Sequence, residues 1–373
     1  MIDSLETGGS ERQFAALARS LQSSCFFSLS LACIQKRGAF LDQLEPMKQF
    51  DLGRSLYGLH SLYTRIRLAR YLRESETAVA HSFDFYSNLA LIPAARLAGL
   101  AAVIGSQRQL GDLLTRRQEL VQAAAFRLCD RVVCNSHAAA DRLIGLGLEP
   151  RKIAIIYNGL APAAFESAAP ALPVRPGLLR VGMIARMNSP AKNHRALLAA
   201  ARRLSPHLLD NLEIVFAGDG PLRSSLETEA NSLGLALRVI FLGDRRDIPA
   251  ILASLDVSVL PSASESLSNA IIESMAAGVS VVASRAGGNP ELLSDQRGLL
   301  IAPGSEQELT LALERLLSDS SLRQGLARNA RKFAAANFTI ELMHKRHEEL
   351  YAEVLDSKLR RQIRLRRVAG SGG

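Results

Sequence analysis

Val-Ser-Val-Leu-Pro-Ser-Ala-Ser-Glu-Ser-Leu-Ser-Asn-Ala-Ile-Ile-Glu, residues 257–273, is the stretch that decides the fold. Its apolar, β-branched start predicts a short buried strand. A serine-rich loop follows, in which Ser266 and Ser268 are natural helix N-caps. The next residues predict a helix that continues to Ala277 and ends at Gly278. A loop of small residues between a strand and a helix leaves backbone N–H groups free at the helix start, and such a place binds phosphate or another anion.

Two acids bracket this predicted anion site. Glu265 lies in the loop, and Glu273 lies eight residues later inside the helix. Carboxylates beside an anion site are useful when they accept hydrogen bonds from a neutral, hydroxyl-rich group such as a sugar or a ribose. The alternative is that Glu265 is an ordinary loop acid and Glu273 lies on a solvated helix face.

Composition limits the class of protein. The chain has 373 residues, of which 48% are hydrophobic, so it is long enough for two globular domains with sizeable cores. The net charge of +9 favours an anionic partner, whether nucleic acid, a phosphorylated substrate or a membrane surface. Because only 5% of residues are aromatic, stacking platforms for single-stranded nucleic acid are not expected. The four cysteines have no metal-binding spacing and fit reduced thiols in a cytosolic protein.

The first half of the chain alternates short apolar runs with helical segments, which is typical of parallel βαβ units. The expected strands are Phe26–Cys33, Ala78–Ala80, Ala101–Ile104 and Val132–Cys134. Polar residues follow several of these strands, where open α/β sheets bind ligands, and His81 is one of them. A structural role for His81 remains the alternative. Near the start of the chain, Gly8 and Gly9 precede a helical pattern and predict either a phosphate loop or a plain turn.

A boundary between two domains is expected in the segment 161–178, which is rich in Ala and Pro. A second βαβ series begins after it, with strands predicted over 179–184, 212–217, 238–242 and 280–283. Helices are predicted over 306–317, 322–335 and 340–355.

Two basic segments leave a membrane role open. Residues 63–73 combine four arginines with an apolar stripe, which fits either a helix on a membrane surface or an ordinary amphipathic helix with a basic outer face. Residues 358–367 form a basic tail, which could contact anionic lipid or be a frayed, solvated terminus.

The order and spacing of the motifs resemble the GT4 family of retaining glycosyltransferases, most strongly over residues 181–300. The motifs are Gly8-Gly9, Ala185-Arg186 with Lys192, Gly218-Asp219-Gly220-Pro221-Leu222, and Glu265-x7-Glu273 followed by Met275-Ala276-Ala277-Gly278. The resemblance implies an α/β protein of GT-B architecture, with two Rossmann-like parallel-sheet domains, an interdomain cleft and a C-terminal helix that crosses back to the first domain. The implied parts are an acceptor-binding domain (1–165), a nucleotide-sugar-binding domain (178–335), the returning helix (336–357) and a basic flexible tail (358–373).

The resemblance also implies roles for individual residues. Arg186 and Lys192 would hold the donor diphosphate, and Gly8 and Gly9 would approach it from the other domain. Glu273 would bind the ribose hydroxyls. The remaining implied contacts are to the donor sugar, from the catalytic candidates Glu265 and His81 and from the backbone N–H groups of Ser266, Leu267 and Ser268.

The implied activity is transfer of a hexosyl group, with retention, from a UDP- or GDP-sugar to a saccharide or lipid-linked saccharide. It would serve surface polysaccharide or glycolipid biosynthesis in the cytoplasm or at the inner face of the membrane. No Asp-x-Asp occurs in the chain, so a metal-independent site without a cofactor is expected, and no nucleic-acid partner. The alternatives are a nucleotide-sugar epimerase or hydrolase of the same fold and a non-catalytic protein that binds anionic surfaces. A nicotinamide dehydrogenase is disfavoured because no G-x-G-x-x-G follows the first strand.

Overall fold

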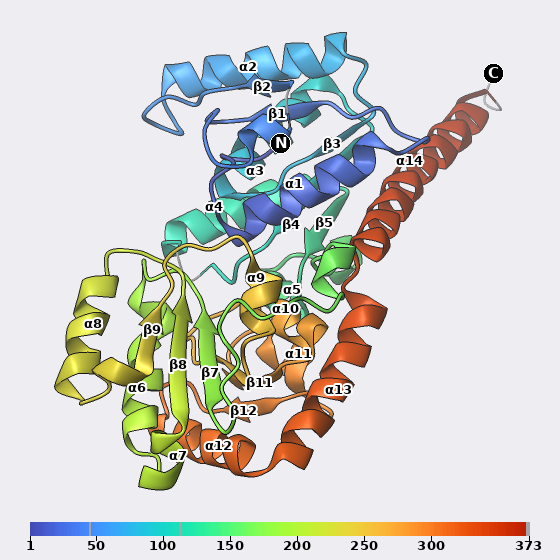
Figure 1. Cartoon of the computed structure of the whole chain (residues 1–373). Coiled ribbons are helices and arrows are strands. Elements are labelled where there is room, and N and C mark those ends of the chain that lie inside the picture. Colours follow the sequence, from blue (N-terminus) through green and yellow to red (C-terminus); the bar gives the residue numbers. More distant parts are fainter. Residues whose placement is uncertain (45, 112–113, 371–373) are drawn as a thin grey trace. The chain divides into compact units, whose positions relative to one another are not determined.

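The computed structural model describes residues 1–44, 46–111 and 114–370 (Figure 1). The chain forms two compact units: unit 1 comprises residues Met1–Gly159 and Ile340–Gly373, and unit 2 comprises Leu160–Thr339. All strand pairs in the described residues are parallel, as the alternation of strand and helix patterns predicted. No helix in the described part of the chain is long and apolar enough to span a bilayer.

Unit 1 contains a four-stranded sheet of order β3-β4-β5-β6 and a two-stranded pair, β1-β2. Its strands are β1 (Leu31–Cys33), β2 (Met47–Gln49), β3 (Val79–His81), β4 (Ala102–Gln107), β5 (Arg131–Cys134) and β6 (Ile153–Ile155). Its helices are α1 (Gly9–Gln22), α2 (Leu59–Glu74), α3 (Phe85–Ala98), α4 (Arg116–Arg127), α5 (His137–Gly145) and α14 (Ile340–Gly370), with short 3-10 turns at Leu41–Gln43 and Pro150–Lys152. The strand expected over Phe26–Cys33 is confined to its last three residues, and Phe26 is exposed.

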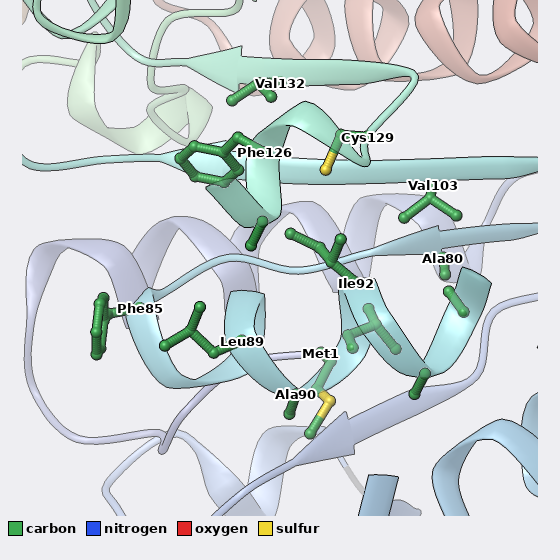
Figure 2. Close-up of a cluster of buried hydrophobic side chains, with 14 of the residues drawn as sticks. Met1, Ala80, Phe85, Leu89, Ala90, Ile92, Val103, Phe126, Cys129 and Val132 are labelled. Atoms are coloured by element: carbon green, nitrogen blue, oxygen red, sulfur yellow. The ribbon is translucent and has the colours of Figure 1, made fainter. Parts of the chain in front are cut away.

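Side chains of successive strand residues point to opposite faces of the unit 1 sheet. Helices pack on both of these faces. On one face, Val103 and Val132 pack with α3 and with Phe126 of α4 (Figure 2). On the other face, Ile104 packs with side chains of α1 and α14, among them Leu17 and Tyr351. Each sheet face therefore has its own apolar core.

The backbone of Met1 and Ile2 lies between β1 and β3. The Met1 α-amino group donates a hydrogen bond to the His81 carbonyl (2.7 Å), and Ile2 forms a parallel bridge with Cys33. These contacts tie the first two residues of the chain to both strands.

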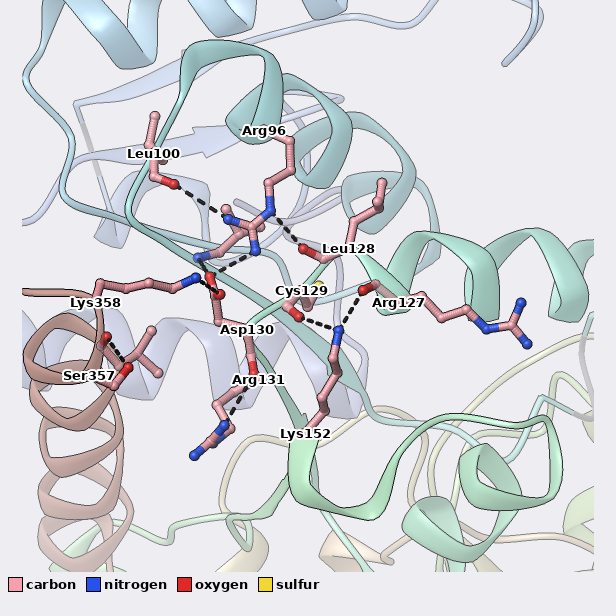
Figure 3. A network of polar contacts seen from close by, with 12 residues as sticks. Arg96, Leu100, Arg127, Leu128, Cys129, Asp130, Arg131, Lys152, Ser357 and Lys358 are labelled. Carbon is pink, nitrogen blue, oxygen red and sulfur yellow. Dashed lines mark hydrogen bonds and ion pairs between the residues drawn. The ribbon is translucent and has the colours of Figure 1, made fainter. Parts of the chain in front are cut away.

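The last helix, α14, packs on unit 1 and continues past residue 355, where the sequence pattern predicted its end, and past residue 357, the end that the resemblance implied. Residues 358–367 contain no Gly or Pro and are rich in strong helix formers, so no local signal ends the helix there. Lys358 does not begin a tail, since its ammonium pairs with the Asp130 carboxylate of unit 1 (Figure 3). The expected flexible end, residues 371–373, lies outside the described residues.

Unit 2 contains a six-stranded sheet of order β12-β11-β10-β7-β8-β9. Its strands are β7 (Leu179–Ile184), β8 (Leu212–Ala217), β9 (Val239–Phe241), β10 (Val257–Leu260), β11 (Ser280–Ser284) and β12 (Leu299–Ile301). Its helices are α6 (His194–Arg202), α7 (Pro206–Asp210), α8 (Arg223–Ser232), α9 (Ile248–Leu252), α10 (Asn269–Ala277), α11 (Asn289–Leu293), α12 (Glu306–Ser318) and α13 (Ser320–Asn337), with short 3-10 turns at Pro162–Ala164, Pro190–Lys192 and Ala236–Arg238.

The stretch 257–273 forms the predicted strand, loop and helix. β10 is buried throughout, and α10 ends at Gly278 in the left-handed conformation (φ 75°). The Ser274 hydroxyl joins the helix to the strand through a hydrogen bond to the Ser258 hydroxyl (2.8 Å). These predictions are confirmed, because the apolar run, the cap and the terminator are all local signals.

Candidate active site

The strand order of the unit 2 sheet reverses between β7 and β10. From β7 the chain adds β8 and β9 on one side, and β10, β11 and β12 occupy the other side. Because β7 and β10 are paired and parallel, the loops that follow them leave the same edge of the sheet next to each other. In open parallel sheets, ligands bind at the carboxyl edge where the strand order reverses. The candidate donor site is therefore the pair of loops after β7 and β10.

Lys192 and Glu265 meet in these loops. The backbone N–H of Ala263, in the loop after β10, donates to the Ala191 carbonyl, in the loop after β7, at 2.8 Å. This contact places the Lys192 ammonium 2.6 Å from a Glu265 carboxylate oxygen. The Glu265 side chain is only 10% exposed, so it is not an ordinary solvated loop acid. The sequence assigned both residues to one site without predicting that they pair.

The N-terminus of α10 carries the predicted serine cap. The Ser268 hydroxyl accepts a hydrogen bond from the Ile271 N–H (3.3 Å), and Ser266, Leu267 and Ser268 are buried. Glu273 is 7% exposed, which excludes the solvated-face alternative. A carboxylate enclosed in this way is suited to accepting hydrogen bonds from a neutral donor group.

The glycine-rich turn after β8 supports the loop that carries Arg186. Gly218 has φ +133°, and a Cβ there would lie 2.2 Å from the Ala185 carbonyl oxygen, so only glycine fits. Two residues after Ala185, the Met187 N–H donates to the Asp219 carbonyl (2.8 Å). Arg186 is exposed between these fixed neighbours, two residues beyond β7. The switch-point edge thus offers an arginine, a lysine paired with an acid, and a capped helix start.

Unit 1 holds a second candidate region, a pocket of about 870 Å³. It lies at the carboxyl ends of β3 and β4, the edge at which the sequence predicted ligand binding. Its lining combines amides, acids, arginines and aromatic rings, including Gln35, Gln107, Gln118, Asp84, Arg108, Tyr57 and Tyr86. Such a lining suits a hydroxyl-rich ligand, because amides and carboxylates bind hydroxyls and aromatic rings pack on apolar faces.

Two half-buried carboxylates of this pocket, Asp3 and Asp84, interact with each other. Asp3 accepts hydrogen bonds from the backbone N–H groups of Tyr86 (3.1 Å) and Ser87 (2.6 Å), at the start of α3. Burial raises the pKa of Asp3 to about 6. Burial, and then repulsion from Asp3, raise the pKa of Asp84 to about 7, although Arg108 opposes the shift.

Arg108 is a site candidate that the sequence analysis did not single out, although it lies in the polar segment after β4. It is 9% exposed, stacks over the Phe83 ring (4.9 Å) and donates to the Asn158 side chain. Its Nε is buried without a hydrogen-bond partner among the described residues. Burial lowers the pKa of Arg108 to about 10, which leaves it charged at neutral pH.

His81 lies at the end of β3 beneath this region. One ring nitrogen is hydrogen-bonded to the Tyr351 hydroxyl (2.8 Å) and the other to the Ser106 hydroxyl (2.7 Å). Burial, followed by repulsion from His347, lowers its pKa well below the ordinary value, so the ring is neutral. Ser106 lines the pocket, whereas His81 reaches it through that hydroxyl.

The glycine pair begins a helix, as predicted. Gly8 is the N-cap of α1 and Gly9 is its first residue. A Cβ on Gly8 would lie 2.0 Å from a carboxylate oxygen of Glu11, so this acid from the first helical turn lies directly over Gly8. Among the described residues, no group of three or more His, Cys, Asp or Glu side chains could hold a metal ion.

Relatives of the chain include glycosyltransferases. The lipopolysaccharide core biosynthesis glycosyltransferase LpsE of Rhizobium meliloti (strain 1021) is 31% identical over 251 residues, which cover 67% of this chain and 69% of that protein. The UDP-Gal:alpha-D-GlcNAc-diphosphoundecaprenol alpha-1,3-galactosyltransferase of Escherichia coli is 26% identical over 352 residues, covering 89% of this chain and 90% of that protein.

Solved structures share the fold. Anabaena Alr3699/HepE in complex with UDP superimposes with a TM-score of 0.82 at 22% identity, covering 94% of this chain and 98% of that one. Its complex with UDP-glucose gives a TM-score of 0.76 at 23% identity, covering 95% and 99%. Residues 7–163 match the family described as Glycosyltransferase Family 4, and residues 179–319 match the one described as Glycosyl transferases group 1. The chain therefore belongs to the group 1 glycosyltransferases of family 4 and has their GT-B fold of two Rossmann-like units.

Proposed function

We propose that this glycosyltransferase moves a hexosyl group, with retention and without a metal, from a nucleoside-diphosphate sugar to a saccharide or lipid-linked saccharide. The product would serve surface polysaccharide or glycolipid biosynthesis. The observation that carries the proposal is the Lys192–Glu265 pair beside the capped start of α10, at the switch point of the unit 2 sheet. We favour UDP as the nucleotide of the donor, because UDP or UDP-glucose is bound in the Anabaena neighbour and UDP-Gal is named for the Escherichia coli relative.

The chemistry of the pair supports this role. Sugar transfer expels a nucleoside diphosphate, so negative charge grows on the leaving phosphate oxygens. Lys192 and Arg186 would balance this charge, with the backbone N–H groups of residues 266–268 beside them. Glu265 would bind donor-sugar hydroxyls, and the buried Glu273 would bind the ribose hydroxyls. Because the cation and the acid are in contact, the two loops that carry them are held together before a donor binds.

Unit 1 would supply the acceptor site and further donor contacts. Its pocket has the polar and aromatic lining that a saccharide needs. Gly8 and Gly9 would approach the diphosphate. His81 would act at the donor sugar through the pocket-lining Ser106 hydroxyl, to which its neutral ring is already hydrogen-bonded. We place the reaction in the cytoplasm, at the inner face of the membrane when the acceptor is lipid-linked.

The first test is nucleotide binding by Lys192→Ala. UDP should raise the melting temperature of the wild-type protein, since a ligand bound to the folded state stabilises it. Removing a charge-assisted contact costs about 1.5–3 kcal/mol, so the variant should bind UDP at least about tenfold more weakly. The matched control is Arg203→Ala, which removes the cation of a different unit 2 ion pair, with Glu306 (3.2 Å), at the C-terminal end of α6.

Equal UDP affinity of Lys192→Ala and the control would contradict the assignment of the donor site. Turnover of a UDP-sugar by Glu273→Ala at the wild-type rate would contradict it as well. Incubation with UDP-glucose alone tests the epimerase or hydrolase alternative, because either activity would change the sugar without any acceptor. Family membership removes the third alternative, a protein without an enzymatic role.

A further inference from the structure

Helix α2 exposes its apolar side. Leu59, Leu62, Tyr63 and Ile66 are 86%, 54%, 60% and 43% exposed, and their spacing places them on one stripe of the helix. The side of α2 that packs on unit 1 includes small and polar residues, Ser61 and Thr64 among them. Larger apolar residues of the packed side, Leu68 and Leu72, occur only in the second half of the helix, so the first half is the reverse of an ordinary surface helix. The outer face of α2 is therefore not only basic, as the alternative of an ordinary amphipathic helix expected, but also apolar.

Arginines flank the exposed stripe. Arg67, Arg70 and Arg73 are exposed, and no acid occurs between Leu59 and Arg73 in the sequence. Arg65, in contrast, turns inward and donates to the Leu89 carbonyl (3.0 Å). The outer surface of α2 thus combines an apolar stripe with two arginines, Arg67 and Arg70, that form no ion pair in the part of the chain that the structure describes.

Helix α2 follows closely in sequence after residues that line the unit 1 pocket. Leu56 and Tyr57 line the pocket, and α2 begins two residues later at Leu59. Arg65 ties the two together, because its guanidinium donates to the Leu56 carbonyl (3.1 Å). Whatever binds the outer face of α2 therefore lies beside the mouth of the pocket.

We propose that the exposed face of α2, formed by Leu59, Leu62, Tyr63, Ile66, Arg67 and Arg70, binds an anionic lipid bilayer and holds the pocket of unit 1 at the membrane surface. The acceptor is then a saccharide carried on a lipid, whose sugar enters the pocket while its lipid stays in the bilayer. This reading of the acceptor rests on the proposed function. A bilayer fits better than a protein partner because the face lies along a helix and joins apolar residues, a tyrosine and arginines, as interfacial helices do.

The test measures sedimentation of the full chain with vesicles of phosphatidylglycerol and phosphatidylcholine, compared with phosphatidylcholine alone. The protein should bind the anionic vesicles, and less strongly as salt is raised. Each arginine near an anionic surface contributes about fivefold to binding, so Arg67→Gln with Arg70→Gln should weaken binding on the order of 20-fold. Leu62→Glu with Ile66→Glu should abolish it. Melting temperatures should not change, because all four side chains are exposed.

The matched controls lie in unit 2. Val174 and Leu237 are exposed large apolar residues, so Val174→Glu with Leu237→Glu should bind vesicles like the wild type. Arg328 and Lys332 are exposed cations of α13, and Arg328→Gln with Lys332→Gln should do the same. UDP stabilisation, measured on every variant, separates the two proposals. Loss of vesicle binding with UDP binding retained is expected for the α2 variants only.

Several results would overturn the proposal. Wild-type protein that binds UDP but neither vesicle would refute the membrane face while leaving the proposed function intact, whereas vesicle binding without UDP binding would refute the function instead. Vesicle binding that survives both α2 variants but disappears when residues 361–373 are removed would assign the contact to the end of the chain. A dimer in light scattering that Leu62→Glu with Ile66→Glu converts to a monomer, with vesicle binding unchanged, would assign the face to a second copy.

Discussion

The two candidate regions handle charge in opposite ways. In unit 2, the Lys192 ammonium and the Glu265 carboxylate neutralise each other at 2.6 Å, and the lysine side chain is 34% exposed. In unit 1, Asp3 and Asp84 are two half-buried acids that repel each other, and Arg108 only partly compensates the charge of Asp84. The unit 2 site is thus balanced before it binds anything, whereas the unit 1 pocket stores unfavourable charge.

This difference matches the ligands proposed for the two regions. A diphosphate carries negative charge, so its site needs cations such as Lys192, which Glu265 holds in place before the donor binds. A neutral saccharide brings only hydroxyls, and these bind well to carboxylates that other protein groups do not saturate. The predictions below test the contrast, from the largest expected effect to the smallest.

Gly218→Ala should have the largest effect, because it disrupts the backbone that supports the unit 2 loops. The new Cβ would lie 2.2 Å from the Ala185 carbonyl oxygen at φ +133°, so the loop that carries Arg186 must move. We expect a loss of about 3 kcal/mol or more of unfolding free energy, measured by urea denaturation, and loss of UDP binding. Gly234→Ala is the control, since Gly234 also has positive φ (+72°) but no atom within 4 Å of the added methyl group. Equal destabilisation of both variants would mean that the close approach is unimportant.

Asp130→Asn should follow, because it breaks the network that joins α14 to unit 1. The Asp130 carboxylate accepts from Arg96 (2.8 Å), from the Val103 N–H (2.9 Å) and from Lys358 (Figure 3). Burial raises its pKa, but the hydrogen bonds from Lys358, Val103 and Arg96 outweigh burial and hold the pKa below its usual value. Its stabilising effect is therefore present above the unfolded pKa and is lost as the pH falls through the folded one.

We expect Asp130→Asn to cost about 2–3 kcal/mol at pH 7, as loss of hydrogen bonds to a charged group does, and the difference from wild type should shrink in strong acid. Urea denaturation at both pH values measures this. Asp141→Asn, at an exposed position of α5, should have no effect at either pH. A helix α14 that contributed nothing to unit 1 would leave Asp130→Asn as stable as that control.

Sequence patterns predicted the local parts of this molecule well. β7, β8 and β10 follow from apolar runs, and the limits of α10 follow from Ser268 and Gly278. The features that these patterns could not predict depend on tertiary contacts. Lys192 and Glu265 are 73 residues apart, and only the parallel pairing of β7 with β10 brings their loops together.

The helix period has a similar limit at α2. It predicts that apolar residues share a face, but not which face packs on the sheet. In α2, Leu68 and Leu72 are buried while Leu62 and Ile66 are exposed, although the sequence grouped them in one stripe. The edge rule for strands did locate the pocket, through the polar residues after β3 and β4. It could not reveal that the half-buried Asp84 interacts there with the buried Arg108.

The charge stored in unit 1 leads to a pH-dependent prediction. Asp84 has a folded pKa of about 7 against an ordinary value of 3.8, so the folded state holds its proton more tightly than the unfolded state does. Stability should therefore fall as the pH rises between these values. Asp84→Asn keeps a good N-cap for α3 but removes the charge, so it should melt higher than wild type at pH 8, by about 2–4 °C. The advantage should largely disappear at pH 5, as thermal unfolding followed by circular dichroism would show.

Asp141→Asn serves again as the control for Asp84→Asn and should match the wild type at both pH values. If the gap between Asp84→Asn and wild type were the same at pH 5 and pH 8, burial would not be raising the pKa of Asp84. The contrast between the paired charges of the unit 2 site and the repelling acids of the unit 1 pocket would then be lost.

The smallest effect is expected from Ser268→Ala, which removes the cap of α10. Loss of a serine cap costs about 1 kcal/mol, and Ser305→Ala should cost the same at α12, where the Ser305 hydroxyl accepts from the Glu308 N–H (3.2 Å). The two variants should therefore melt together. They should differ in UDP affinity, because only α10 starts at the switch point, where its first N–H groups would face the diphosphate. Weaker UDP binding by Ser268→Ala alone would tie the helix start to the donor, whereas equal binding by both would reduce Ser268 to a structural cap.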